Sequence, residues 1–140
     1  MSVSAGDIEQ ILAAAQNLVT AFGRHDTQAY FACFSPDASF VFYTHDKVLN
    51  SRAEYESLWA SWERDFGFRV LSCQSRDPQV QIYRDVGIMR HNVTTHVRTL
   101  DGDQQIQERE TIVFAKNRTG AWIGIHEHLS PMPAPNEDQA

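Results

Sequence analysis

The chain has 140 residues, of which 42% are hydrophobic and 21% charged, and it is long enough to bury the core of one domain. Its formal net charge of −6 argues against nucleic acid or an anionic membrane as partner, because both require a concentrated basic surface. No stretch approaches the ~18 consecutive apolar residues that cross a bilayer, and residues 1–7 lack the basic region of a signal peptide. The sequence therefore predicts a cytoplasmic protein.

The first third of the chain has the apolar spacing of helices. Residues 8–22 repeat apolar side chains at three- and four-residue steps, and Gly23 is expected to end that helix in the left-handed conformation. A second, short helix begins near Asp26, which is a good N-cap. Residues 38–44 favour a strand, and a capping box at residues 51–54 opens a third helix that Gly67 closes.

From residue 68 onward the pattern predicts only strands. They are expected at 68–76, 79–83, 86–99, 105–116 and 121–129, separated by turn-forming residues. Helices followed by long hairpin strands indicate an α+β fold, with three N-terminal helices on a curved, mainly antiparallel mixed sheet. Such a sheet leaves a cone-shaped cavity, where a ligand is expected. Residues 1–131 are predicted to form a single domain, followed by a flexible tail at 132–140.

Motifs across the chain resemble one superfamily. The C-terminal hairpin carries a Glu-Thr pair and a tryptophan followed by His-x-His, namely Glu110-Thr111, Trp122 and His126-x-His128. Three earlier features fit the same pattern: Asp26-x-x-x-Tyr30, the Pro36-Asp37-Ala38 turn and Trp62. This resembles the SnoaL-like, ketosteroid isomerase-like proteins of the nuclear transport factor 2-like superfamily, which have a cystatin-like fold. It is especially similar to the association domain of calcium/calmodulin-dependent protein kinase II. The resemblance specifies the fold more than the activity.

The resemblance also implies which side chains face the cavity. The association domain has pocket arginines at positions that fall on Ile112, on Leu129 and near Thr95, none of which is basic here. An apolar cavity is therefore expected. Strand alternation puts Glu110 and Glu127 on the side of Ile112 and Leu129, and puts the two C-terminal histidines on the other.

Glu110 is the candidate proton carrier, because a carboxylate on a cavity wall is desolvated and exchanges protons near neutral pH. The resemblance to ketosteroid isomerase-like sites makes Tyr30 or Tyr43 the donor to an enolate oxygen. His45, His91 and His96 are the candidate acid–base partners. The alternative is structural: Glu110 pairs with Arg90 or Arg109.

The third helix supplies the other candidate ligand contacts. Tyr55, Trp59 and Trp62 share its apolar stripe and either line the cavity or form core, and Trp62 matches a pocket tryptophan of the association domain. The further candidates are His45, His91, Ile112 and Leu129. No metal is expected, since His126-x-His128 has no third ligand marked by spacing. No cofactor is expected. Cys33 and Cys73 could form a disulfide, but two isolated cysteines in a domain of this size are more often buried free thiols.

Two functions remain open. The first is a small-molecule domain that binds an apolar cyclic compound, either without turnover or as a cofactor-free isomerase, cyclase or dehydratase. The second is a non-catalytic association domain that forms a homodimer or ring through its outer sheet face, with Trp122, His126 and His128 in the contact.

Overall fold

A computed structural model describes residues 5–133 of the chain. Three helices and five strands follow one another as α1 (Ala5–Gly23), α2 (Thr27–Ala32), β1 (Phe34–Phe42), α3 (Arg52–Phe66), β2 (Arg69–Tyr83), β3 (Val86–Thr99), β4 (Gly102–Lys116) and β5 (Trp122–Pro131). Of the predicted tail at 132–140, residues 134–140 lie outside the described residues. The α+β class, with three helices and a long run of strands, is as predicted.

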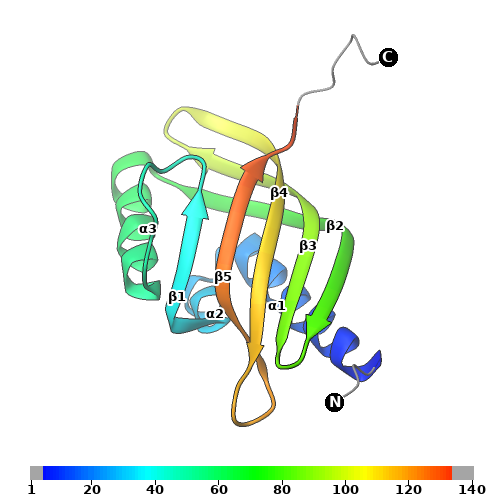
Figure 1. Ribbon diagram of the computed structural model, residues 1–140. Helices are drawn as coiled ribbons and strands as arrows, with labels where there is room; N and C mark the ends of the chain where they lie inside the picture. Colours follow the sequence, from blue (N-terminus) through cyan, green and yellow to red (C-terminus); the bar gives the residue numbers. More distant parts are fainter. Residues whose placement is uncertain (1–4, 134–140) are drawn as a thin grey trace.

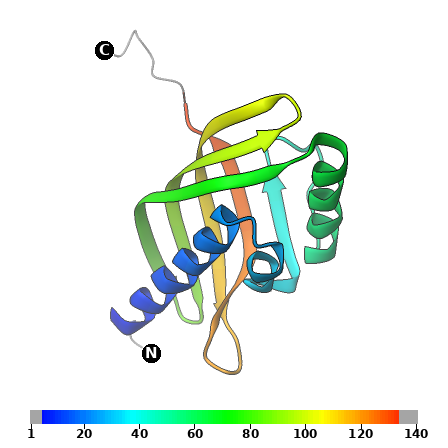
Figure 2. The same cartoon turned by 180° about the vertical axis from the view of Figure 1, so that it is seen from behind.

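The strands form one mixed sheet in the order β1-β5-β4-β3-β2. The parallel pair is β1 with β5, and the other neighbours are antiparallel. Helices α1 and α2 cover one face, α3 lies beside β1, and no helix within residues 5–133 covers the opposite face (Figures 1 and 2). The strands bend so that the β3–β4 hairpin reaches the end of α3, where the Leu100 N–H donates to the Phe66 carbonyl at 2.8 Å.

Local sequence explains where the helices begin. Asp26 caps α2 by accepting from the Ala29 N–H, and Ser51 caps α3 by accepting from the Glu54 N–H. The Glu54 carboxylate reaches back to the Asn50 N–H, one residue before the usual capping-box position. Gly67 ends α3 with φ 62°, the left-handed conformation that glycine adopts without strain.

The end of α1 differs from the prediction. Gly23 does not adopt the left-handed conformation, and the residue that does is His25, with φ 55°. Gly23 is required for a different reason: a Cβ there would lie 3.0 Å from the backbone nitrogen of Cys73. The glycine therefore lets α1 approach β2 closely.

Two strand boundaries also differ. The predicted strands 68–76 and 79–83 are one strand, β2, with a register shift between Arg76 and Gln79 and with Asp77 at φ 53°. Asp77-Pro78 thus forms a bulge instead of a turn. Strand β1 begins at Phe34, earlier than predicted, because Phe34 already pairs with Gly124 of β5.

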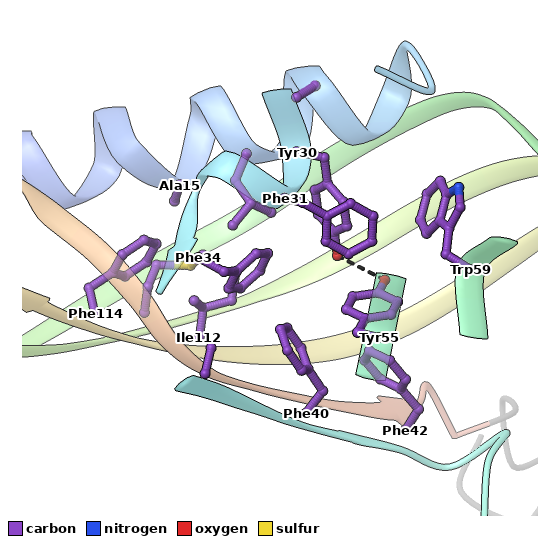
Figure 3. Packing of buried hydrophobic residues seen from close by; sticks show 14 of the residues in the cluster. Ala15, Tyr30, Phe31, Phe34, Phe40, Phe42, Tyr55, Trp59, Ile112 and Phe114 are labelled. Atoms are coloured by element: carbon purple, nitrogen blue, oxygen red, sulfur yellow. Dashed lines mark hydrogen bonds between the residues drawn. The ribbon is translucent and has the colours of Figure 1, made fainter. Parts of the chain in front are cut away.

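The core is aromatic and lies between the helices and the inner sheet face (Figure 3). Tyr30, Phe34, Phe40 and Trp59 are fully buried there. Tyr55 contacts Phe40 at 4.6 Å between ring centroids and Phe31 at 5.0 Å. Such rings bury large apolar areas and pack in tilted or edge-on pairs, so they hold α2 and α3 rigidly against the sheet.

Candidate active site

A cavity of about 330 Å³ lies between the helices and the inner face of the sheet. All three helices and all five strands contribute to its wall, which consists mainly of aromatic and aliphatic side chains: Leu18, Val19, Phe22, Tyr30, Phe42, Tyr43, Thr44, Tyr55, Trp62, Phe66, Phe68, Cys73, Val93, Thr95, Val97, Thr99, Gln104, Ile106, Glu108, Glu110, Glu127 and Leu129. A cavity of this size accommodates a small cyclic molecule.

Three carboxyl groups interrupt this apolar wall. Glu108 and Glu110 are two residues apart on β4 and share its inner face, while Glu127 lies on the neighbouring strand β5. The ladder pairs Glu110 with Leu129 and Ile112 with Glu127, so Glu110 and Glu127 are diagonal neighbours. Strand alternation thus predicts correctly that both face inward.

Glu110 belongs to a hydrogen-bonded series that continues away from the cavity. Its Oε1 lies 2.6 Å from Nε2 of His91, the residue directly opposite on β3. Nδ1 of His91 lies 2.6 Å from the Ser75 hydroxyl of β2. When Glu110 is ionised it can only accept, so Nε2 of His91 donates to it and Nδ1 accepts from Ser75. The side chain of His91 is fully buried, which fixes this arrangement.

Glu127 belongs to a second series that comes from the helices. The Tyr30 hydroxyl donates to its Oε1 at 3.4 Å, and the hydroxyls of Tyr30 and Tyr55 lie 3.0 Å apart (Figure 3). Burial raises the pKa of Glu127 well above its usual range, and the nearby Glu110 carboxylate raises it further. The two carboxyls also share a hydrogen bond. Burial and the neighbouring carboxylate therefore both favour the protonated form of Glu127.

Glu108 lies nearer the exposed end of the cavity. It accepts a hydrogen bond of 2.7 Å from the hydroxyl of Tyr43, whose side chain is 45% exposed. Burial raises the pKa of Glu108, an effect that Tyr43 partly offsets and Glu110 reinforces. Burial and the Glu108 carboxylate together raise the pKa of Tyr43. Tyr43 thus stays protonated and donates to Glu108.

Comparison with known proteins agrees with this geometry. The model of the SnoaL-like domain family matches residues 11–135.

The chain belongs to the SnoaL-like family.

Solved structures show the same fold. A ketosteroid isomerase-like protein from Erwinia carotovora atroseptica is 20% identical with a TM-score of 0.78, covering 94% of this chain and 100% of the other. The hub of the S. rosetta CaMKII is 21% identical with a TM-score of 0.73, covering 93% and 100%. A Nostoc punctiforme protein with a cystatin-like fold is 18% identical with a TM-score of 0.72, covering 96% and 97%. No protein with a curated description matches.

The SnoaL-like cavity includes some of the predicted ligand contacts. Tyr30, Tyr43, Tyr55, Trp62 and Leu129 line it. His91 does not line the cavity directly, but it contacts the cavity through Glu110.

Other predicted contacts lie elsewhere. Trp59 packs inside the helical layer and borders a surface groove between α2 and α3. Ile112 is fully buried but is not part of the cavity wall. His45 lies in the turn after β1, and His96 is exposed on the outer sheet face, since the cavity-lining Thr95 and Val97 on either side of it point inward.

The predicted outer position of Trp122 is wrong. Trp122 is only 8% exposed, and a Cβ added at the inward-facing Gly87 would lie 3.8 Å from its ring. The reason is a β-bulge in β5: Phe114 pairs with Gly124 but Val113 pairs with His126, which leaves Ile125 as an extra residue. Alternation therefore changes phase at Ile125, and Trp122 shares the inner side with Glu127.

The two histidines of β5 do point away from the cavity. Nδ1 of His126 lies 2.7 Å from the Ser39 hydroxyl, and the His126 and His128 rings are 6.1 Å apart. Desolvation lowers the pKa of His126, and His128 lowers it further. Residues 5–133 contain no group of three His, Cys, Asp or Glu side chains arranged to hold a metal ion.

The sequence suggested Arg90 or Arg109 as a structural ion-pair partner for Glu110, but the partner in the structure is His91. Neither Arg90 nor Arg109 forms an ion pair with Glu110; Arg90 donates instead to Gln79 at 3.3 Å.

Both cysteines are free thiols, and Cys73 borders the cavity, where burial raises its pKa to about 12. No helix within residues 5–133 has the length and hydropathy to cross a bilayer.

Sequence reasoning missed three residues of the site. Glu108 could have been found by alternation from Glu110, and Glu127 was placed inward without being given a role. Ser75 could not have been found, because its contact with His91 depends on the bulge at Asp77-Pro78. That bulge lies opposite His91, between the pairs Arg76–Asn92 and Gln79–Arg90.

Proposed function

We propose that this SnoaL-like domain binds an apolar cyclic molecule in its cavity and moves a proton on it, as an isomerase, cyclase or dehydratase without a cofactor. Glu110 acts as the base. The ketosteroid isomerase-like structural neighbour is compatible with this chemistry, but at 20% identity it supports the fold alone.

One observation carries the proposal: two adjacent carboxyls in an apolar cavity have opposite environments. Glu110 faces the imidazole of His91, which donates to the ionised form. Glu127 is fully buried, and its burial raises its pKa and so favours its protonated form. Pairs of acids whose surroundings separate their protonation states supply a base and an acid in one site.

The chemistry follows from those states. The Glu110 carboxylate takes a proton from a carbon next to a substrate carbonyl, and the C–H electron pair passes to the carbonyl oxygen as an enolate. The hydroxyls of Tyr30 and Tyr55 and the protonated carboxyl of Glu127 line the same cavity, and a substrate oxygen that replaces one of their present hydrogen-bond partners accepts from them. Return of the proton from Glu110 to another carbon completes an isomerisation. In a dehydration the enolate instead re-forms the carbonyl and expels a hydroxyl group from the β-carbon, which leaves as water with the proton that Glu110 took up.

Solvent exchange tests this step without knowledge of the natural substrate. A bicyclic ketone such as β-tetralone is incubated in deuterium oxide, and loss of its α-proton signal is followed by NMR. The wild-type chain should accelerate exchange, Glu110→Gln should abolish the acceleration, and Glu9→Gln on the exposed face of α1 should retain it. Equal rates for wild type and Glu110→Gln would overturn the proposal.

A second candidate function is self-association through the uncovered sheet face. Val41, Val113, Ile125 and His126 are only partly exposed on β1, β4 and β5, and no helix covers that face (Figure 1). The CaMKII hub neighbour is an example of this fold. Sedimentation equilibrium should give a dimer or larger ring that His126→Glu dissociates; a monomer at micromolar concentration would exclude self-association.

The cytoplasmic location also stays a prediction.

A further inference from the structure

The charge of the cavity wall indicates what kind of molecule fits it. Glu108, Glu110 and Glu127 supply three carboxyl groups, and among the described residues no lysine or arginine lines the cavity. His91 is the nearby imidazole, and it lies behind Glu110 and outside the wall. An anionic ligand in the cavity would therefore be repelled by carboxylates and would find no lysine or arginine of the described residues to pair with.

The remaining wall is rich in aromatic rings. Phe22, Tyr30, Tyr55, Trp62 and Phe68 come from the helices and from the residues that lead into β2. Phe42 is buried in the same wall, while Tyr43 and Phe66 line the cavity and are also exposed to solvent. The faces of such rings carry negative potential and attract organic cations, most strongly where water is excluded. Aromatic faces and carboxyl groups therefore favour the same charge in a ligand.

We propose that the cavity takes an organic cation, an alkylated amine or ammonium group attached to an apolar ring. This deepens the proposed function, since it names the substrate class for the same site. The ring fills the aromatic part of the cavity, and the charged nitrogen lies among Glu108, Glu110 and Glu127.

The hydrogen bonds of the acids agree with this assignment. Tyr43 donates to Glu108 and Tyr30 donates to Glu127, so these two acids have neutral hydroxyl partners, and no lysine or arginine of residues 5–133 lines the cavity beside them. Two of the three acids also have a raised pKa, because each is buried near another carboxyl. A bound cation supplies the missing positive charge and draws at least one of these acids into its ionised form.

Binding of a cation is therefore coupled to release of a proton. The group that releases it is chiefly Glu127, which faces titratable side chains from every layer around it: Tyr30 of α2, Tyr55 of α3, Cys73 of β2, and Glu108 and Glu110 of β4, with His91 of β3 behind Glu110. Around neutral pH the tyrosines and Cys73 keep their protons, since burial raises the pKa of each. Affinity for a cation should consequently rise with pH.

Two probes of nearly equal shape isolate the effect of charge. meta-Hydroxyphenyltrimethylammonium and meta-tert-butylphenol differ mainly in the positive nitrogen. Calorimetric titration of the full chain should show the cation binding at least about tenfold more tightly, in keeping with a desolvated cation–π contact. Repeating the titration in buffers of different ionisation enthalpy should show proton release with the cation and none with the neutral probe.

Substitutions of single glutamates test which carboxyl group releases the proton and which one attracts the cation. Glu127→Gln should remove most of the proton release, and Glu108→Gln should reduce the preference for the cation several-fold. Glu9→Gln, which removes an exposed carboxylate of α1, should change neither. Because glutamine keeps the acceptor oxygen of each site, the tyrosine hydrogen bonds remain and the fold is expected to survive.

The outcomes separate this proposal from the proposed function. Equal affinity for the two probes, or tighter binding of the neutral one, would overturn the cation assignment, whatever the result of ketone exchange. A clear preference for the cation supports the assignment even if Glu110→Gln leaves ketone exchange unchanged. In that case the domain binds an organic cation without carrying out the proposed proton transfer.

Discussion

Nε2 of His91 and Oε1 of Glu110 lie 2.6 Å apart across the β3–β4 ladder, where the two residues are direct partners. Neighbours in this position have Cβ atoms close enough for their side chains to bond without bending either strand. The regular antiparallel register thus places an imidazole beside a carboxylate that lines the cavity. His91 acts as a positioning residue, because it contacts Glu110 and not the cavity.

Replacement of His91 by leucine should weaken exchange catalysis by about tenfold, at the low end of what general acid–base groups contribute. Glu110 loses the N–H donor that orients its carboxylate, so kcat should fall while KM stays close to that of the wild type. His91→Gln keeps an N–H donor and should restore part of the rate. Equal rates for His91→Leu and His91→Gln would show that His91 only fills space.

Tyr30 and Tyr55 should behave as a coupled pair. Tyr30→Phe leaves the buried Tyr55 hydroxyl and Glu127 without their partner, at a cost of about 1–3 kcal/mol in the free energy of unfolding. The double variant Tyr30→Phe/Tyr55→Phe should cost less than the sum of the single variants. Urea denaturation at one pH measures all three, and strict additivity would contradict the hydrogen-bonded series.

Stability should decrease as pH rises above the usual range of a carboxyl group. Glu127 has a raised pKa in the folded chain, so the folded state binds more protons than the unfolded state between those two values. The free energy of unfolding then falls with rising pH, by at most about 1.4 kcal/mol per pH unit for one proton. Glu127→Gln should flatten this slope. An unchanged slope would mean that Glu127 is ionised in the folded chain.

Gly124→Ala should destabilise the fold more than Gly87→Ala. A Cβ at Gly124 would lie 2.7 Å from the ring of the fully buried Phe34 and 3.3 Å from the Cys33 carbonyl, neither of which can move easily. A cost of about 1–3 kcal/mol is expected for such overpacking. At Gly87 the clash is with the terminal methyl of Ile11, which can rotate. Thermal unfolding of both variants checks the order.

Much of the fold was predictable because its determinants are local. The capping serine before α3, the left-handed Gly67 after it and the turn residues between the β strands each act over a few residues. Period-two alternation also placed Glu110 and Glu127 on the inner face.

The predictions that were wrong or missing share one cause, because each depends on a contact between residues that are distant in sequence. The bulge at Ile125 reverses the side of Trp122, and it is defined by pairing with β4. The need for glycine at position 23 comes from Cys73, on a strand 50 residues later. Ser75 reaches His91 because β2 bulges. Alternation within one strand contains no information about any of these contacts.

The most direct test of this account is the protonation state of Glu127 at neutral pH, measured by infrared difference spectroscopy of wild type against Glu127→Gln. The account predicts a carbonyl stretch of a protonated carboxylic acid in the wild type, absent from Glu127→Gln and retained in Glu9→Gln. If the wild type shows no such band, both carboxyls of the Glu110–Glu127 pair are ionised. The division into a base and a neutral acid, on which the proposed proton transfer rests, would then be wrong.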